Sequence, residues 1–113
     1  MSDEEAKEEL FVEAVDAFGD AKLDEAVEKY QKALEIDAKY QDALHVLARA
    51  QFDNGDVDGA ISSAKRLTDI DTEDILAHTS LSMFYHAKGL IEEAEKEGNT
   101  ARILGWKQDL KND

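Results

Sequence analysis

The stretch LDEAVEKYQKALEID, residues 23–37, carries the pattern on which the fold depends. Its apolar side chains recur at intervals of three and four residues, so they share one face of a helix while charged residues occupy the other. These apolar residues are Leu23, Ala26, Val27, Tyr30, Ala33, Leu34 and Ile36. A lone helix cannot bury such a face, so the stretch predicts a partner helix packed against it.

The same pattern returns twice along the chain at a constant spacing. Ala26, Ala60 and Ala94 are 34 residues apart (60−26 = 94−60 = 34). Four further sets keep this phase: Ala14, Ala48 and Ser82; Leu23, Val57 and Ile91; Ala21, Gly55 and Gly89; and Ile36, Ile70 and Leu104. Self-similarity at this period is typical of stacked helix pairs. The sequence therefore predicts three antiparallel helical hairpins that share one continuous interior.

The composition supports a nearly all-helical chain. The 113 residues suffice for one modest domain, 42% of them are hydrophobic, and there are six glycines and no proline. The chain has no cysteine, which excludes disulfides, thiol nucleophiles and thiolate metal sites.

The charge balance is strongly acidic. Thirteen Lys and Arg residues against 27 Asp and Glu residues give a formal charge of −14. Such a chain repels phosphate backbones, so we expect no nucleic-acid partner. The charge favours basic partners, or it serves only solubility, which is the plainer reading. No apolar run approaches the roughly 20 residues of a membrane span, and the acidic start is unlike a signal peptide, so we expect no membrane contact and a cytoplasmic location.

Local signals place the expected helix ends. Ser2 suits an N-cap, the motif Asn54-Gly55-Asp56 supplies both halves of a turn, and Asp71 suits the cap of the third hairpin. Gly105 and Trp106 are expected to end the last helix. The expected organisation is an acidic lead-in at 1–6, repeats at 7–40, 41–74 and 75–106, and a polar tail at 107–113.

Three copies in one phase resemble the tetratricopeptide repeat, a helix–turn–helix unit of 34 residues. That family has small residues near the eighth, twentieth and twenty-seventh places and glycine at the inner turn. Those places hold Ala14, Ala48 and Ser82; Ala26, Ala60 and Ala94; Ala33, Leu67 and Ala101; and Ala21, Gly55 and Gly89. The resemblance implies a right-handed α-solenoid of three such units with a short C-terminal cap.

The sequence also departs from the family pattern. Ala21 replaces the turn glycine of the first repeat, and the usual aromatic of the second helix, Tyr30, becomes Ala64 and Gly98 in the later repeats. A glycine within a helix costs about 1 kcal/mol relative to alanine. Gly98 therefore indicates either a loose helix end or a close approach of another group to its backbone.

The resemblance further implies a concave groove, lined by the first helix of each hairpin, that holds a peptide or helix of a partner protein. The implied lining is Phe11, Val12, Val15, Phe18, His45, Val46, Arg49, Phe52, Leu76, Thr79, Ser80, Met83 and His86. This set is apolar for a solvated surface, which usually indicates a partner. The alternative, that Phe11 and Phe18 belong to the core, is equally open from the sequence.

Some members of the family grip a C-terminal carboxylate with Lys, Arg and Asn side chains. The matching positions here hold Phe11, Val15, Val46, Leu76 and Ser80, which offer no charged donor. We therefore expect no binding of that kind. Arg49 is the one cation of the implied groove and would be the anchor for an acidic group on a ligand.

No motif in the sequence predicts catalysis, a cofactor or a metal. His45, His78 and His86 lack the i,i+4 spacing of helical ligands, the serines lack a base at a motif spacing, and no glycine loop suits phosphate. The chain is therefore expected to be no enzyme but an interaction scaffold. The alternative is a self-assembling homo-oligomeric module.

Trp106, the only tryptophan, leaves two readings open. In the first, Trp106 and Leu110 fold back and cover the third repeat of a monomer, because the terminal unit of a solenoid needs protection. In the second, two chains share an incomplete cover and form a homodimer. We favour the first, since a short helix can cover one hairpin.

Overall fold

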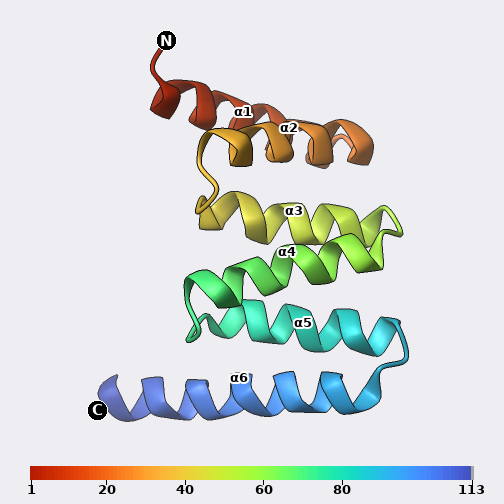
Figure 1. The fold of residues 1–113 in the computed structure, drawn as a ribbon, viewed down its shortest axis with the longest axis vertical. Coiled ribbons are helices and arrows are strands. Elements are labelled where there is room, and N and C mark those ends of the chain that lie inside the picture. The colour runs from red at the N-terminus through yellow and green to blue at the C-terminus, as the bar shows by residue number, and fades with distance from the viewer. Residues whose placement is uncertain (113) are drawn as a thin grey trace.

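The computed structural model describes residues 1–112, which form six helices and no strand. The helices are α1 (Asp3–Gly19), α2 (Leu23–Ile36), α3 (Gln41–Asp53), α4 (Val57–Ile70), α5 (Ile75–Ala87) and α6 (Ile91–Asn112). They lie one after another along the long axis in chain order, with the termini at opposite ends (Figure 1). The all-helical hairpin solenoid expected from the 34-residue period is confirmed.

The packing follows the order of the chain. Extensive contacts join α1 to α2, α3 to α4 and α5 to α6, and smaller ones join α2 to α3 and α4 to α5. The molecule is accordingly elongated, with principal extents of 42 × 35 × 22 Å. Each hairpin thus buries its apolar face partly on itself and partly on the next hairpin, as a repeat architecture requires.

Carboxylate and hydroxyl caps fix the starts of three helices. Ser2 accepts the N–H of Glu5 at 3.2 Å, Asp56 accepts that of Gly59 at 2.9 Å, and Asp74 accepts that of Ala77 at 3.1 Å.

Asp71 does not cap α5, contrary to expectation. It ends α4, and its carboxylate accepts the N–H of Glu73 in the connecting turn.

The turns inside the three hairpins share one left-handed residue. Its φ is +85° at Gly55, +81° at Gly89 and +61° at Ala21. Glycine adopts this conformation freely, whereas the Cβ of alanine crowds the backbone there. The first hairpin therefore makes the same turn as the others at a conformational cost.

Small residues lie where the helices approach one another. Ala14, Ala26, Ala60 and Ala94 are fully buried, while Tyr30, Phe84, Leu44, Leu47, Leu67 and Leu81 fill the space between helices. Gly98 belongs to this scheme, since a Cβ at that position would stand 3.2 Å from the Ser82 hydroxyl. Ser82 in turn donates to the Ala94 carbonyl at 2.8 Å. The close-approach reading of Gly98 is therefore the right one.

The last helix is longer than the sequence indicated. α6 continues through Gly105 and Trp106 to Asn112, so residues 107–112 extend it rather than form a separate tail; Asp113 lies outside the described residues. Trp106 and Leu110 do not fold back over the third repeat, because 60% and 74% of their surfaces are exposed. Within residues 1–112 no helix combines the length and the apolar character needed to cross a membrane.

Candidate ligand-binding face

The first helix of each hairpin carries every residue implied for the groove. These residues lie on α1, α3 and α5, and we call the exposed side chains of these three helices the first-helix face. Four of its apolar residues are open to solvent. Val12 and Leu76 are exposed by 57% and 58%, and Val15 and Met83 are also exposed. Such side chains keep a large part of their apolar surface in solvent and are available to a ligand.

The aromatic residues of the predicted lining are tied to the core instead. Phe11 lies against Tyr30 and Tyr40, with ring centroids 5.9 and 5.3 Å apart. Phe52 stacks on Phe84 at 4.9 Å, and this pair joins α3 to α5. Phe18 and Val46 are likewise partly buried against the core cluster that includes Ala14, Tyr30 and Leu47. These side chains hold the helices in place and offer at most one edge to a ligand.

Three polar residues of the predicted lining have partners within the chain. His45 Nε2 lies 2.8 Å from Asp74 Oδ2, and Arg49 Nε donates to Asp53 at 3.0 Å. The Thr79 hydroxyl donates to a backbone carbonyl one turn earlier. Arg49 is exposed yet already paired with a carboxylate, so its attraction for an acidic ligand is reduced. His86 is exposed near the end of α5.

Acidic side chains flank the apolar ones on the first-helix face. Glu8 and Asp42 occupy the repeat position that Leu76 holds in the third hairpin (42−8 = 76−42 = 34), and both are exposed. Lys7 does not offset them, because it forms ion pairs with Glu4 at 2.9 Å and Asp37 at 3.0 Å. Those hydrogen bonds raise the pKa of Lys7 and lower that of Asp37. The face is therefore apolar with an acidic surround.

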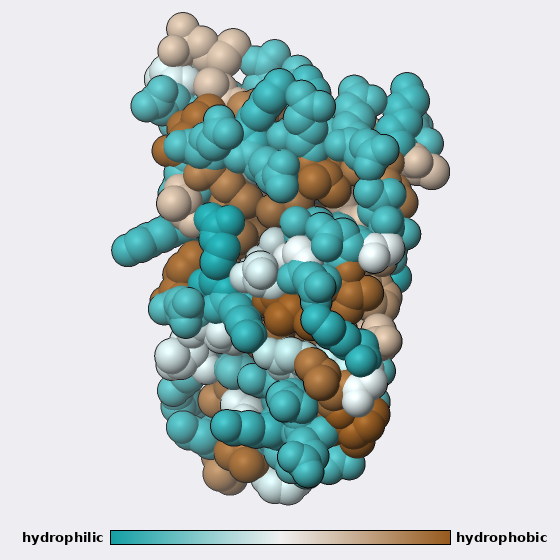
Figure 2. Space-filling view, turned by 45° about the vertical axis from the view of Figure 1, so that its right-hand side comes forward, coloured by the Kyte–Doolittle hydropathy of each residue, from teal (hydrophilic) through white to brown (hydrophobic). Residues whose placement is uncertain are grey.

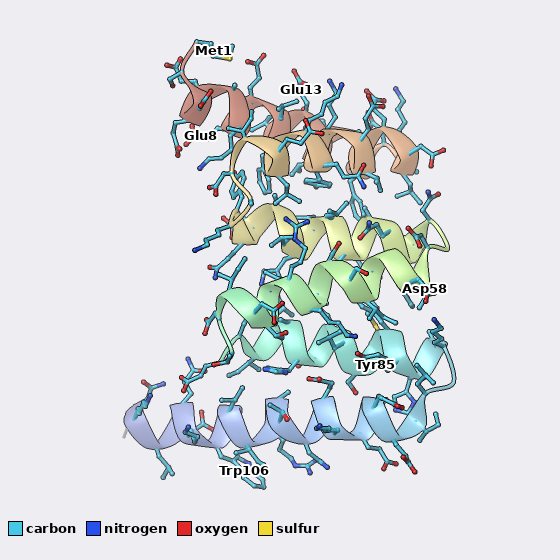
Figure 3. All side chains as sticks on the ribbon, viewed as in Figure 1. Met1, Glu8, Glu13, Asp58, Tyr85 and Trp106 are labelled. Carbon is cyan, nitrogen blue, oxygen red and sulfur yellow. The ribbon has the colours of Figure 1, made fainter. Side chains whose placement is uncertain are left out.

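Apolar and hydrophilic residues are mixed on the surface of the molecule. In Figure 2 the apolar residues form patches that hydrophilic residues interrupt on the side that faces the viewer. Glu8 and Glu13 project from the N-terminal end in Figure 3. No group of three or more metal-ligating side chains comes together in the part of the chain that the structure describes.

A hollow at the other end of the molecule was not foreseen from the sequence. It lies between the α4–α5 connection and the end of α6, and its lining is Asp71, Glu73, Ile75, Leu104, Lys107, Gln108, Lys111 and Asn112. Lys107 lies 3.9 Å from Glu73 across it. No sequence signal marks this hollow, because the pattern predicts a tail over 107–113 rather than a continuation of the last helix.

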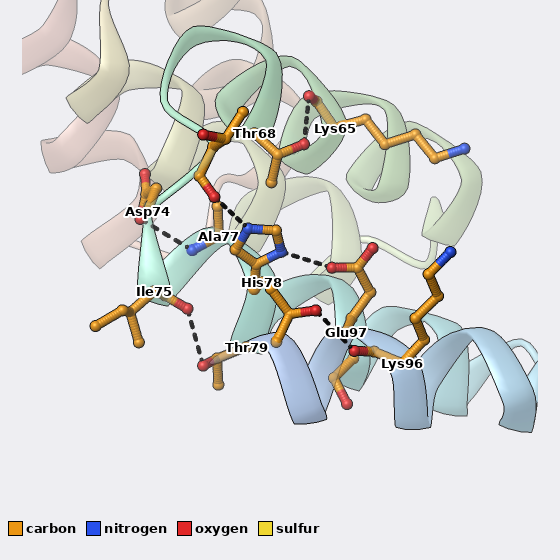
Figure 4. A network of polar contacts seen from close by, with 12 residues as sticks. Lys65, Thr68, Asp74, Ile75, Ala77, His78, Thr79, Lys96 and Glu97 are labelled. Carbon is orange, nitrogen blue, oxygen red and sulfur yellow. Dashed lines mark hydrogen bonds and ion pairs between the residues drawn. The ribbon is translucent and has the colours of Figure 1, made fainter. Parts of the chain in front are cut away.

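The sequence favours surface or groove positions for the three histidines, but His78 is buried and forms a polar network. Its Nδ1 lies 2.6 Å from Glu97 on α6, and its Nε2 lies 2.8 Å from the Thr72 carbonyl (Figure 4). Burial opposes a charge on the ring, but the hydrogen bonds to Glu97 and Thr72 outweigh it and raise the pKa of His78. Both ring nitrogens face acceptors, so this histidine ties α5 to α6 and has no free nitrogen for a metal.

Several solved structures share this fold. A crystal structure of MamA is similar with a TM-score of 0.89 and 25% identity over 92% of this chain, which spans 61% of the length of the MamA chain. The first TPR domain of Spaghetti (RPAP3), bound to the HSP90 peptide SRMEEVD, has a TM-score of 0.83 and 21% identity over 88% of this chain and 79% of its own. The Yersinia enterocolitica type III secretion translocator chaperone SycD has a TM-score of 0.83 and 21% identity over 88% of this chain and 76% of its own.

Comparison with curated protein sequences gave no match. A family model for the tetratricopeptide repeat, however, matches residues 17–83, more than half of the chain. This stretch runs from the end of α1 into α5 and includes the left-handed turns at Ala21 and Gly55, and the equivalent turn at Gly89 follows it. The chain belongs to the tetratricopeptide repeat family.

Proposed function

We propose that this chain is a non-catalytic interaction module. Its first-helix face binds an amphipathic segment of a partner protein. The observation that carries the proposal is the set of exposed apolar side chains on α1 and α5, namely Val12, Val15, Leu76 and Met83. A protein of the same fold binds a peptide, the HSP90 segment in the RPAP3 complex, which supports the general mode. Burial of apolar side chains supplies affinity in such grooves.

The charge of the face selects the chemistry of the partner. Glu8, Asp42 and Asp53 are exposed around the apolar side chains, and Arg49 is paired with Asp53. A segment with lysine or arginine beside its apolar positions complements this surface and meets it faster. An acidic peptide does not, because the whole chain carries a charge of −14 and the positions that would hold a carboxylate lack charged donors.

A pair of labelled model peptides tests the proposal. Fluorescence anisotropy would be measured with an amphipathic peptide of leucine and lysine and with its leucine and glutamate counterpart. We expect saturable binding of the lysine peptide only. The double variant Val15→Gln, Met83→Gln should weaken that binding by roughly tenfold or more, since each buried apolar side chain contributes on the order of 1 kcal/mol.

The control variant is Ile36→Gln, which removes an exposed apolar side chain from the end of α2, a second helix of a hairpin. It should bind like the wild type. Unchanged binding by the Val15, Met83 variant, or equal binding of the glutamate peptide, would refute the proposal. Phe52 is unsuitable for such a test because its stacking on Phe84 makes it part of the fold.

A further inference from the structure

An apolar stripe lies on the outer side of α6, at the end of the solenoid. Ile103, Trp106 and Leu110 are spaced by three and four residues, so they share one helix face. They are exposed by 52%, 60% and 74%. Trp106 points away from the rest of the molecule in Figure 3, and the C-terminal turns of α6 reach past the neighbouring helices in Figure 1.

The stripe does not lie where a second helix of these hairpins meets the next hairpin. On α2 the positions that face the next hairpin are Val27 and Leu34, which pack against the core. The corresponding positions of α6, 68 residues later (95−27 = 102−34 = 68), are Glu95 and Arg102. Charged residues at these positions avoid exposing apolar surface to water on the outer side of the last hairpin. The Ile103, Trp106 and Leu110 stripe departs from this protection, so it requires another explanation.

The charges of α6 identify what fits the stripe. The first part of the helix, residues 91–98, has four glutamates against one lysine, whereas residues 99–112 have Arg102, Lys107 and Lys111 against one aspartate. The stripe lies in the basic part of an otherwise strongly acidic protein. A second α6 running in the opposite direction brings its acidic part to this basic part, and the two helix dipoles then also oppose each other. A parallel arrangement brings like charges together.

Stacking of copies end to end is disfavoured by α1. Glu9, Glu13 and Asp16 occupy the positions that hold the buried Ala43, Leu47 and Ala50 in the second hairpin (43−9 = 47−13 = 50−16 = 34). If α6 of one copy covered α1 of the next as α2 covers α3, these carboxylates would be buried near Glu95. Glu13 is paired with Lys29 at 2.8 Å, and Arg102 also lies on that side of α6, but taking several charged groups out of water is costly even when they are paired. We therefore do not expect copies to stack through this face.

We propose that α6 is a self-association surface through which two copies of this chain form an antiparallel two-fold dimer, with its axis near Ile103 and the Ile103, Trp106 and Leu110 stripe of each copy packed on α6 of the other. Stable interfaces bury about 800 Å² per partner, and a three-residue stripe with its neighbours offers less. The dimer is therefore reversible and forms at micromolar or higher concentrations. It leaves the first-helix face on α1, α3 and α5 open, so it is compatible with ligand binding there.

Concentration-dependent measurements test the dimer. Sedimentation velocity from roughly 10 µM to roughly 1 mM should show the wild type shifting from monomer to dimer. Trp106 is the only tryptophan, so its emission should shift to the blue over the same range as the indole leaves water. Trp106→Gln should remain monomeric, with an unchanged circular dichroism spectrum because the side chain is exposed.

The matched control is Leu76→Gln, which removes an equally exposed apolar side chain from α5. It should dimerise like the wild type. A wild type that stays monomeric throughout, or a dimer that survives Trp106→Gln, would overturn the proposal. A dimer lost equally in Leu76→Gln would overturn it as well, because the first-helix face would then be the interface.

Cysteine cross-linking tests the antiparallel arrangement on a background without native cysteines. Leu110 and Lys96 lie at equal distances on either side of Ile103 (110−103 = 103−96 = 7). A two-fold axis near Ile103 therefore brings Leu110→Cys of one copy beside Lys96→Cys of the other. Mixed oxidation of these two variants should give the mixed disulfide. Efficient cross-linking of Leu110→Cys with itself would contradict the antiparallel dimer.

Discussion

At the scale of single residues, the buried hydroxyl of Tyr30 destabilises the core. Its ring is fully buried against Phe11, and its hydroxyl has no hydrogen-bond partner. Burial raises the pKa of Tyr30 to about 12, in keeping with a hydroxyl cut off from water. A buried polar atom without a partner costs about 1–3 kcal/mol. The aromatic ring is retained for its volume, and the hydroxyl adds a penalty.

Replacement of Tyr30 by phenylalanine should therefore stabilise the protein. The change keeps the ring and removes the unpaired hydroxyl, so we expect the free energy of unfolding to rise by about 1 kcal/mol and the melting temperature by about 4 °C. Thermal denaturation followed by circular dichroism measures both. Tyr85→Phe serves as the control, since the Tyr85 hydroxyl is not among the buried unpaired atoms. A clear loss of stability in Tyr30→Phe would show that its hydroxyl has a partner in solution.

Ala21 offers a second test at this scale. Its φ of +61° costs an L-residue about 1–2 kcal/mol. Glycine avoids this cost, but part of the gain is lost because glycine raises the conformational entropy of the unfolded chain. Ala21→Gly should raise the free energy of unfolding by roughly 0.5–1 kcal/mol in urea titration. Gly55→Ala, at the equivalent turn, should lower it. The same sign for both substitutions would contradict the conformational argument.

The 34-residue period was sufficient to predict most residue positions. It placed Ala14, Ala26, Ala60 and Ala94 at the helix crossings because only small side chains fit where axes approach. It could not separate Val15, which is exposed, from Phe52, which is stacked on Phe84. Both lie on the same kind of helix, and the reach of an aromatic ring toward the next hairpin decides its burial.

At the scale of helices, His78 of α5 contacts Glu97 of α6, and we expect the strength of this contact to depend on the protonation of His78. The ring joins Glu97 to the Thr72 carbonyl, and its pKa in the folded protein is raised above the ordinary value of about 6.5. A raised pKa means that the folded state binds the proton more tightly than the unfolded chain. The resulting stability is fully present below about pH 6.5 and is lost as the pH rises through the folded pKa.

Stability should therefore fall between about pH 6 and pH 9 by more in the wild type than in His78→Gln, which does not titrate. Urea denaturation at a series of pH values measures the difference, and the NMR titration of the His78 ring should give a midpoint above 6.5. Identical pH profiles for the two proteins would mean that the Glu97 contact carries no net coupling.

Helix ends were predictable only where a strong local signal stood alone. Asn54-Gly55-Asp56 combines a left-handed residue with an N-cap, and the turn lies there. The helix end predicted at Gly105 was wrong, because one glycine within a helix costs only about 1 kcal/mol and helix-forming residues follow it. Asp71 and Asp74 both suit a cap, and the structure has Asp74 as the N-cap of α5 and Asp71 at the end of α4.

At the scale of the whole molecule, the net charge of −14 destabilises the folded state by self-repulsion. Most of the ion pairs involve at least one exposed side chain, and exposed pairs contribute about 0–1 kcal/mol each. Screening the repulsion should outweigh weakening the pairs. We therefore expect the melting temperature to rise by a few degrees between roughly 20 and 200 mM NaCl. A fall over that range would show that the ion pairs dominate.

The overall architecture followed from the sequence because each hairpin repeats one local problem. Helical hairpins whose apolar faces recur every 34 residues bury those faces by stacking on one another, as Figure 1 shows. The exposed end of α6 did not follow, because no second copy of that surface exists in the chain for comparison. The ligand of the first-helix face stays a prediction for a similar reason, since repeat positions fix where a side chain lies and not what it touches outside the molecule.

The unequal packing along the chain has a mechanical consequence. The helices within a hairpin share more contacts than α2 shares with α3 or α4 with α5, and within residues 1–112 no broad contact links the two ends. Each seam is therefore the softest joint of the molecule, and a small rotation at both changes the curvature of the whole stack. A binding surface built across such joints can flatten or tighten around its guest while every hairpin stays rigid.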